Sequence, residues 1–355
     1  MKTRMVLLLL CLLLGGQSVY GQRLFRVISY NVENLFDTQD NPLAEDEEFL
    51  PQGQRHWTPK RYYHKLQQIA KVITAAGEWT EPALIGLCEV ENDSVLYHLC
   101  HRTPLRTQGY RYVCSDTDDP RGIRVALLYQ RDQFALVGYE SLRIPFRGGR
   151  KRSRPLLHVW GRVVTGDTLD VFVCHFPSRS GGQLESESFR MDAARHLRRA
   201  CDSLYQLRQH PHLIAMGDLN DTPIDRSLLE GLKAQPYAPK LTSPMTDTLT
   251  LYNLFATRRT GQPEGSHKYQ GAWSQLDHCL VDGSVLQANA TFRLRPEGVR
   301  IFDADFLWTT DKTYAGRRPK RTFYGFTYEG GFSDHLPLIV DFYLHLPAEK
   351  EKDNE

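Results

Sequence analysis

Two short motifs, far apart in the chain, carry side chains suited to metal-assisted hydrolysis. Gly217-Asp218-Leu219-Asn220 follows the apolar residues 214–216, and Ser333-Asp334-His335 precedes the apolar residues 338–340. In an extended segment Asp218 and Asn220 point to the same side. A carboxylate, an amide and an imidazole at the ends of buried strands can hold a hard cation and orient a water molecule. We interpret the two motifs as parts of one hydrolytic site.

Four further residues lie at the ends of apolar runs. Asn31 and Glu89 follow the first two runs, His175 follows residues 169–174, and Asp277 precedes His278. Each has an ordinary alternative: Asn31 as a turn former, Glu89 in a salt bridge and His175 as a buried core histidine. Asp277 is placed to orient a histidine and fix its tautomer. Taken with the two motifs, these residues favour a shared site.

This set of side chains matches the needs of phosphoester cleavage. The reaction requires an activated water, stabilised charge on the phosphoryl oxygens and a stabilised leaving oxygen. Oxygen ligands with open positions fit Mg²⁺ better than zinc, with Mn²⁺ or Ca²⁺ as alternatives. The sequence has no GxxxxGKS loop, GxSxG elbow or close histidine cluster, so a covalent nucleophile is not supported.

The elements that must position these residues are short strands. Eight apolar runs bounded by Gly, Pro, Asp or Asn have the character of buried strands, namely residues 25–29, 83–88, 125–129, 156–164, 169–174, 213–216, 276–281 and 338–344. Helical spacing appears around residues 66–73 and 197–204. The pattern predicts an α/β fold with two packed sheets flanked by helices, in one domain over residues 22–346 with a charged tail at 347–355.

Residues 1–21 are typical of an export signal. Lys2 and Arg4 precede an apolar run at 6–14, which is shorter than the about 20 residues that cross a bilayer. We expect an exported protein, periplasmic or extracellular, with no stable membrane span.

Without residues 1–21 the 44 basic residues fall to 42, against 42 acidic residues, so the protein has no overall electrostatic field that attracts polyanions. The six remaining cysteines form no CxxC pair, and we expect mostly free, buried thiols.

In this order the motifs resemble the endonuclease/exonuclease/phosphatase family, which includes pancreatic deoxyribonuclease and inositol-polyphosphate phosphatases. The resemblance spans residues 29–344 and implies a four-layered α/β sandwich of two mainly antiparallel sheets. It places Asn31, Glu89 and Asp334 at the metal. It implies catalytic roles for His175 at the phosphate, for the pair Asp218 and Asn220, for Asp277 as the support of a histidine, and for His335 as an acid/base or phosphate-stabilising residue.

Other segments resemble an exported bacterial branch of this family. They are residues 31–37, 178–182, 269–273 and 321–325. Within this set of features, Arg179 and Arg190 are suggested phosphate contacts, with a surface salt bridge as the alternative for each. Two basic segments, 147–154 and 317–321, are either solvated loops or a rim that grips phosphate.

The leading hypothesis is an exported Mg²⁺-dependent phosphodiesterase, a nuclease acting on nucleic acid as a monomer. A phosphatase or phospholipase-type diesterase, acting on sugar, inositol or lipid phosphates, is the alternative, because one fold serves all these substrates. Neutral net charge favours a small phosphate ester, and the two basic segments favour a polyanion. A non-catalytic surface-binding module is a remote third interpretation.

Overall fold

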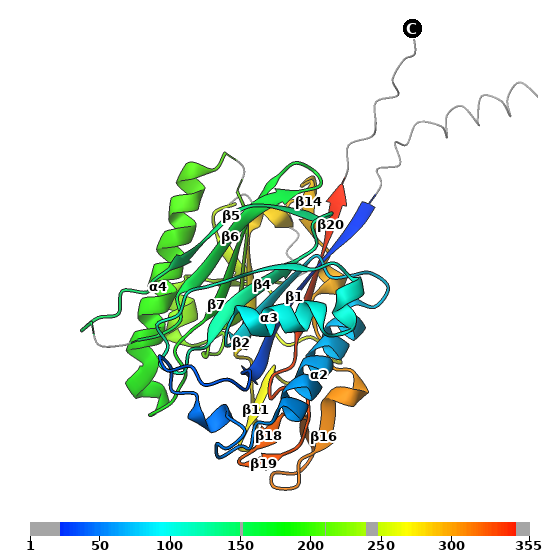
Figure 1. The fold of residues 1–355 in the computed structure, drawn as a ribbon. Coiled ribbons are helices and arrows are strands. Elements are labelled where there is room, and N and C mark those ends of the chain that lie inside the picture. The colour runs from blue at the N-terminus through cyan, green and yellow to red at the C-terminus, as the bar shows by residue number, and fades with distance from the viewer. Residues whose placement is uncertain (1–21, 150–151, 210, 239–247, 346–355) are drawn as a thin grey trace, which may run out of the picture.

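The computed structural model describes residues 22–149, 152–209, 211–238 and 248–345, and two β-sheets form its centre (Figure 1). The first sheet has the order β14 (Phe292–Leu294), β20 (Leu338–His345), β1 (Gln22–Leu35), β2 (Leu84–Val90), β4 (Arg124–Tyr129) and β3 (Arg111–Cys114), with β15 (Arg300–Ile301) also on β20. The second has the order β5 (Phe134–Leu142), β6 (Leu156–Val163), β7 (Thr168–His175), β8 (His212–Asp218), β13 (Asp277–Asp282), β10 (Leu251–Asn253) and β9 (Gln235–Pro236). Most neighbouring strands are antiparallel, as predicted.

Each sheet contains a parallel pair near its centre. Strands β1 and β2 are parallel, with Asn31 opposite Cys88, and β7 and β8 are parallel, with His175 opposite Asp218. The carboxyl ends of a parallel pair lie at the same edge of a sheet. Polar residues that follow these four strands are therefore brought to one end of the molecule.

Helices cover the outer faces of the sheets, which gives four layers. Helices α2 (Pro59–Gly77) and α3 (Asp93–His101) lie beside the first sheet, and α4 (Gln183–Leu207) lies beside the second (Figure 1). Thr58 begins α2 by accepting a hydrogen bond from the Arg61 amide, and Asn92 begins α3 in the same way with Val95. No helix of the described residues is long and apolar enough to cross a bilayer.

The two inner sheet faces fit closely where the site begins. Gly86 of β2 leaves room for Met216 of β8, since a Cβ at Gly86 would lie 3.0 Å from the Met216 side chain. The Cys88 thiol donates to the Cys174 carbonyl at 3.3 Å across the same interface. These contacts hold β2 against β7 and β8.

Short helical turns and three hairpins complete the fold. The turns are η1 (Glu47–Phe49), η2 (Pro104–Thr107), η3 (Ser227–Gly231), η4 (Gly283–Leu286), η5 (Pro296–Gly298) and η6 (Asp305–Leu307). The hairpins pair β11 (His267–Tyr269) with β12 (Ala272–Ser274), β16 (Trp308–Thr310) with β17 (Arg317–Pro319), and β18 (Phe323–Tyr324) with β19 (Thr327–Tyr328). They lie at the end of the molecule toward which β1 runs, which is the lower end in Figure 1.

All eight predicted strand segments are strands, and both segments with helical spacing lie in α2 and α4. Helix α3 and several strands, including β3, β5, β10 and β14, were not predicted. Strand β5 is an edge strand with many exposed positions, so no continuous apolar run marks it. The six cysteines of the described residues are free, as expected. The predicted export signal at 1–21 and the tail at 347–355 lie outside the described residues.

Candidate active site

The first sheet contributes Asn31 and Glu89 at the ends of its parallel pair. Glu89 is an extra residue in β2, because the pairing with β4 shifts between Cys88 and Val90, and its φ is +66°. Such a bulge redirects one side chain out of the ladder. The Glu89 carboxylate accepts hydrogen bonds from Asn31 Nδ2 at 3.3 Å and from the Asn34 amide at 2.8 Å. The bulge therefore turns the carboxylate toward the end of the sheet.

The second sheet contributes His175, Asp218 and Asn220. Gly217 has a φ of +136°, and a Cβ there would lie 1.9 Å from the Cys174 carbonyl oxygen, so only glycine allows β8 to approach β7 so closely. Asp218 Oδ2 accepts from Asn31 Nδ2 at 3.1 Å and lies 3.7 Å from His175 Nε2. The backbone N–H of Asn220 donates to Asp218 Oδ1 at 2.9 Å.

His335 joins the two sheets across the site. It precedes β20 of the first sheet, and its Nδ1 lies 2.6 Å from Oδ2 of Asp277, which opens β13 of the second. Its other nitrogen, Nε2, lies 3.8 Å from Asp218 Oδ2. The Asp277 carboxylate thus fixes the orientation of the ring and leaves Nε2 directed at Asp218.

The pKa values of the two histidines are shifted in opposite directions by their surroundings. Burial alone would lower the pKa of His335, but the carboxylates of Asp277 and Asp218 outweigh it and hold that pKa well above its usual value. Burial, with Arg154 and Arg121 nearby, keeps the pKa of His175 well below its usual value. We therefore assign a cationic ring to His335 and a neutral ring to His175. The Nδ1 atom of His175 is buried without a hydrogen-bond partner.

The donor set fits a divalent cation. Burial, together with the charges of Asp277 and Glu89, raises the pKa of Asp218 to about 7, because buried carboxylates repel one another. A bound divalent cation would relieve this repulsion. Hard carboxylate oxygens are the ligands that Mg²⁺ and similar cations prefer, and Glu89 presents its carboxylate to a cleft. Asn31 turns its Nδ2 toward the carboxylates, while its Oδ1 accepts from the Glu33 amide at 3.0 Å.

Asp334 has different partners from Glu89. Arg321 donates to Asp334 Oδ2 at 2.6 Å, and His267 Nε2 lies 3.7 Å from the same oxygen. Ligand atoms of His267, Asp334 and His335 lie within 4.8 Å of one another. A cationic His335 has no free lone pair for a metal, and Arg321 already binds Asp334, so this group is a weaker candidate for a cation than Glu89. The three predicted metal residues are thus divided between Asn31 with Glu89 and Asp334 with His267.

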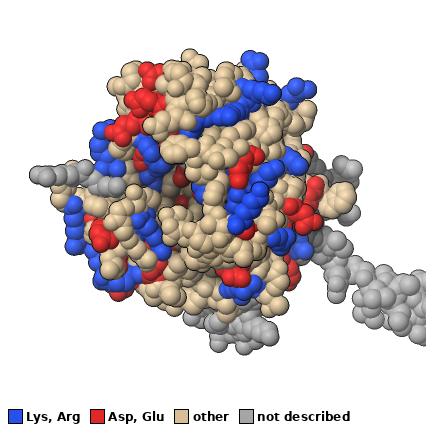
Figure 2. Space-filling view, turned by 90° about the horizontal axis from the view of Figure 1, so that it is seen from below, with Lys and Arg blue, Asp and Glu red and all other residues tan. Residues whose placement is uncertain are grey.

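A cleft of about 670 Å³ opens over these groups. Its lining includes five of the predicted residues and three arginines, namely Glu89, His175, Asp218, Asn220, His335, Arg121, Arg152 and Arg154. Figure 2 views the molecule from this end, where Lys and Arg side chains occur in separate groups interspersed with Asp and Glu. The cleft can therefore receive an anionic group within a surface of mixed charge.

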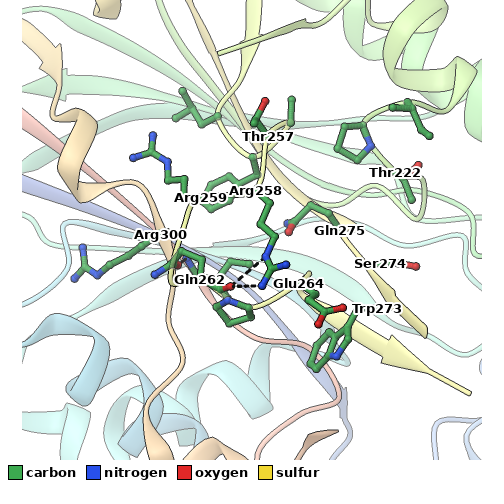
Figure 3. Close-up of a pocket in the computed structure, with 17 residues that line it drawn as sticks. Thr222, Thr257, Arg258, Arg259, Gln262, Glu264, Trp273, Ser274, Gln275 and Arg300 are labelled. Carbon is green, nitrogen blue, oxygen red and sulfur yellow. Dashed lines mark hydrogen bonds between the residues drawn. The ribbon is translucent and has the colours of Figure 1, made fainter. Parts of the chain in front are cut away.

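A separate cavity of about 290 Å³ lies between the loop after Asn220 and residues 254–264 (Figure 3). Thr222, Trp273 and Gln275 line it, and the Arg258 guanidinium is turned back to the Gln262 carbonyl at 3.2–3.3 Å. None of the predicted site residues lines this cavity. It is distinct from the cleft that holds the catalytic candidates.

Arg179 and Arg190 bind protein groups. Arg179 donates to the Asn220 carbonyl at 2.8 Å and to Asp225 at 2.8 Å. The Arg190 side chain has no exposed surface and forms an ion pair with Asp221 at 2.7 Å. A phosphate contact requires exposure, so we replace that expectation for Arg190 with a role in holding the loop that carries Asn220.

Replacing Arg190 with methionine should destabilise the fold by about 3 kcal/mol, because a buried carboxylate then loses its main cation. Urea unfolding of R190M and wild type measures the difference. R226M is the matched control, since the Arg226–Glu230 pair is exposed, and its unfolding should be unchanged. A large rise in KM with unaltered stability would instead return Arg190 to substrate contact.

His267 and Arg321 were missed as site residues by the sequence analysis. A single β-bridge to His335 places His267 at the site, with the two rings 4.5 Å apart. Arg321 lies between β17 and β18. Local sequence carries no sign of either contact. Arg321 does lie in the segment 321–325 that resembles the exported branch, which was the one available signal.

Comparison with known proteins agrees with this geometry. A model of the endonuclease/exonuclease/phosphatase family matches residues 26–344. An endonuclease/exonuclease/phosphatase family protein from Bacteroides thetaiotaomicron has a TM-score of 0.55 at 15% identity, covering 95% of this chain and 100% of that one. A mannosyl-6-phosphatase from the same organism has a TM-score of 0.54 at 17% identity (90% and 99% covered), and the human Nocturnin catalytic domain with bound sulfate has 0.53 at 15% (91% and 96%). A comparison with curated protein sequences found no match.

Proposed function

The chain belongs to the endonuclease/exonuclease/phosphatase family and is a metal-dependent phosphoric ester hydrolase, and we propose that it is exported, uses Mg²⁺ and acts on a small phosphate ester. A small-ester phosphatase is therefore preferred to a nuclease. The observation that carries this preference is the pairing of arginines in both basic segments with the protein's own carboxylates.

In each of the two basic segments, two of the described arginines are paired with carboxylates of the protein. In the first, Arg154 is buried against Asp119 at 2.7 Å and Arg147 lies 3.5 Å from Asp192. In the second, Arg318 binds Glu329 and Arg321 binds Asp334, each through a charged hydrogen bond of 2.6–2.9 Å. An extended polyanion gains affinity from unpaired cations along its backbone. Because these arginines are already paired, we infer a substrate with one phosphoryl group in the cleft in preference to an extended polyanion.

The residues around the cleft supply the parts of a hydrolytic reaction. A divalent cation held at Glu89 would provide a Lewis acid for the phosphoryl oxygens. Asp218, held by Asn31 and the Asn220 amide, is placed to orient the attacking water and accept its proton. Cationic His335, fixed by Asp277, is placed to stabilise the charge that develops on the phosphoryl group.

A nuclease remains the second candidate because two basic side chains line the cleft beside the catalytic group. Arg121 is half-exposed and lies 3.3 Å from Asp119, and Arg152 also lines the cleft. Together they could follow a nucleic-acid backbone across the cleft.

A substrate panel separates these functions. The protein without residues 1–21 is incubated with hexose phosphates, inositol phosphates, plasmid DNA and structured RNA, with Mg²⁺ and with chelator. We expect phosphate release from small esters that chelator abolishes and added Mg²⁺ restores. Chelator-sensitive nicking without phosphate release would establish the nuclease, and binding without either reaction would indicate a non-catalytic module. Sequencing the amino terminus of the exported protein, expected to begin at Gln22, tests the export signal.

A further inference from the structure

A second, smaller pocket lies beyond Asp334, outside the cleft that holds the catalytic group. Its volume is about 200 Å³, below the roughly 300–1,000 Å³ that accommodates a whole drug-sized ligand. Three tyrosines line it, one from each of three chain segments: Tyr269 at the β11–β12 hairpin, Tyr314 between β16 and β17, and Tyr324 of β18. The pocket has room for one ring of a larger substrate.

The pocket adjoins the phosphate site. Asp334 and Arg321 line the pocket, whereas His267 and His335 line the cleft. Only 3.7 Å separates Asp334 Oδ2 from His267 Nε2, so one side-chain contact forms the boundary. A group attached to a phosphate in the cleft would therefore meet this pocket on the Asp334 side.

The charged groups of the pocket are already paired within the protein. Lys268 Nζ lies 2.9 Å from Asp311, and these two side chains are almost fully buried. Arg318 is paired with Glu329, and Arg321 with Asp334. A pocket with balanced charges gives a second anion no advantage, but its remaining lone pairs and N–H groups can bind hydroxyls.

The tyrosines give this pocket an apolar surface with polar edges. Tyr269 and Tyr314 are 63% and 45% exposed, and the Tyr324 hydroxyl lies 3.3 Å from Thr313 Oγ1. The hairpin turn positions them: Gly271 has a φ of +84°, and a Cβ there would lie 3.1 Å from the Tyr314 Cβ. Exposed aromatic faces beside hydrogen-bonding groups suit a ring that has both C–H faces and hydroxyls.

We propose that this tyrosine pocket binds an uncharged, hydroxyl-bearing sugar ring whose phosphate occupies the cleft. The inference rests on the proposed function, since it names the part of the substrate that the pocket selects. It also gives a role to residues 269–273 and 321–325, two segments that the catalytic group leaves unexplained.

The Y269A and Y314A variants test this assignment, with Y139A as the matched control, because Tyr139 is 52% exposed on the edge strand β5. For a hexose phosphate we expect kcat/KM to fall about tenfold in each pocket variant. For glycerol phosphate, which has no ring, kcat/KM should stay at the wild-type value, as it should for Y139A with both substrates. An equal fall for both substrates would overturn the assignment and leave the tyrosines a structural role.

A binding measurement distinguishes failure of the pocket from failure of the proposed function. Saturation-transfer NMR with methyl hexosides and with nucleosides requires no turnover. Transfer to a hexoside that is lost in Y314A supports the pocket even if no phosphate ester is cleaved. Transfer to nucleosides alone, or transfer that is unchanged in Y314A, would overturn the sugar assignment.

Discussion

Replacing His335 with glutamine should lower kcat by about 10⁴-fold, with a small change in KM. The substitution removes a cationic ring that lies 2.6 Å from Asp277 and 3.8 Å from Asp218, at the centre of the catalytic group. Loss of an acid–base group and of charge stabilisation each costs about 10²-fold or more in rate. Steady-state kinetics on the best substrate of the panel, with saturating Mg²⁺, provide the measurement.

H101Q serves as the control for H335Q. His101 is exposed at the end of α3, and its replacement should leave kcat unchanged. Circular dichroism and thermal unfolding establish that both variants are folded. If folded H335Q retained more than a tenth of wild-type activity, the central role of His335 would be wrong, and His175 would become the leading candidate.

Replacing Asp277 with asparagine should reduce kcat by about 10³-fold and change its pH dependence. Asp277 is the first of the carboxylates that raise the pKa of His335, so D277N lowers that pKa. The protonated ring is then lost at a lower pH than in the wild type. The alkaline limb of the kcat profile should consequently move to lower pH.

The sign of the stability effect follows from the same shift. A histidine with a raised folded-state pKa stabilises the fold fully below its unfolded value, near 6.5, and this contribution disappears as pH rises through the folded value. D277N should therefore lose more stability at pH 6 than at alkaline pH. D282N is a useful comparison, since burial raises the pKa of Asp282 to about 8 and an uncharged side chain already suits that site. A pH profile for D277N that coincided with the wild-type profile would contradict this coupling.

The sequence was most informative where function follows local chemistry. Asn31, Glu89, His175, Asp218 and Asp277 were found because each adjoins an apolar strand, and a strand end has a defined place in a sheet. The pattern of apolar runs also predicted the two-sheet fold. It could not predict the bulge that redirects Glu89, because a bulge depends on how β2 pairs with β4.

Contacts made by hairpins and ion pairs were not predictable. The link from His267 to Asp334 requires β11 to meet the segment before β20, and no local pattern encodes that meeting. An arginine in sequence shows nothing about its burial, so Arg190 was assigned to the substrate although it lies inside the protein against Asp221. The ion pairs between arginines of the two basic segments and carboxylates elsewhere in the chain could not be predicted for the same reason.

The division of the site between two sheets makes catalytic activity a sensitive measure of how the sheets are packed. Glu89 and His335 come with one sheet, and Asp218 and Asp277 with the other; each sheet keeps its own hydrogen bonds whether or not the two remain in contact. A small slide along the Met216–Gly86 contact would leave both sheets intact while separating the catalytic groups. As denaturant is added, activity should therefore be lost at a lower concentration than secondary structure. A cation bound between the two sheets should bring these two concentrations closer together, because it stabilises the contact between the sheets.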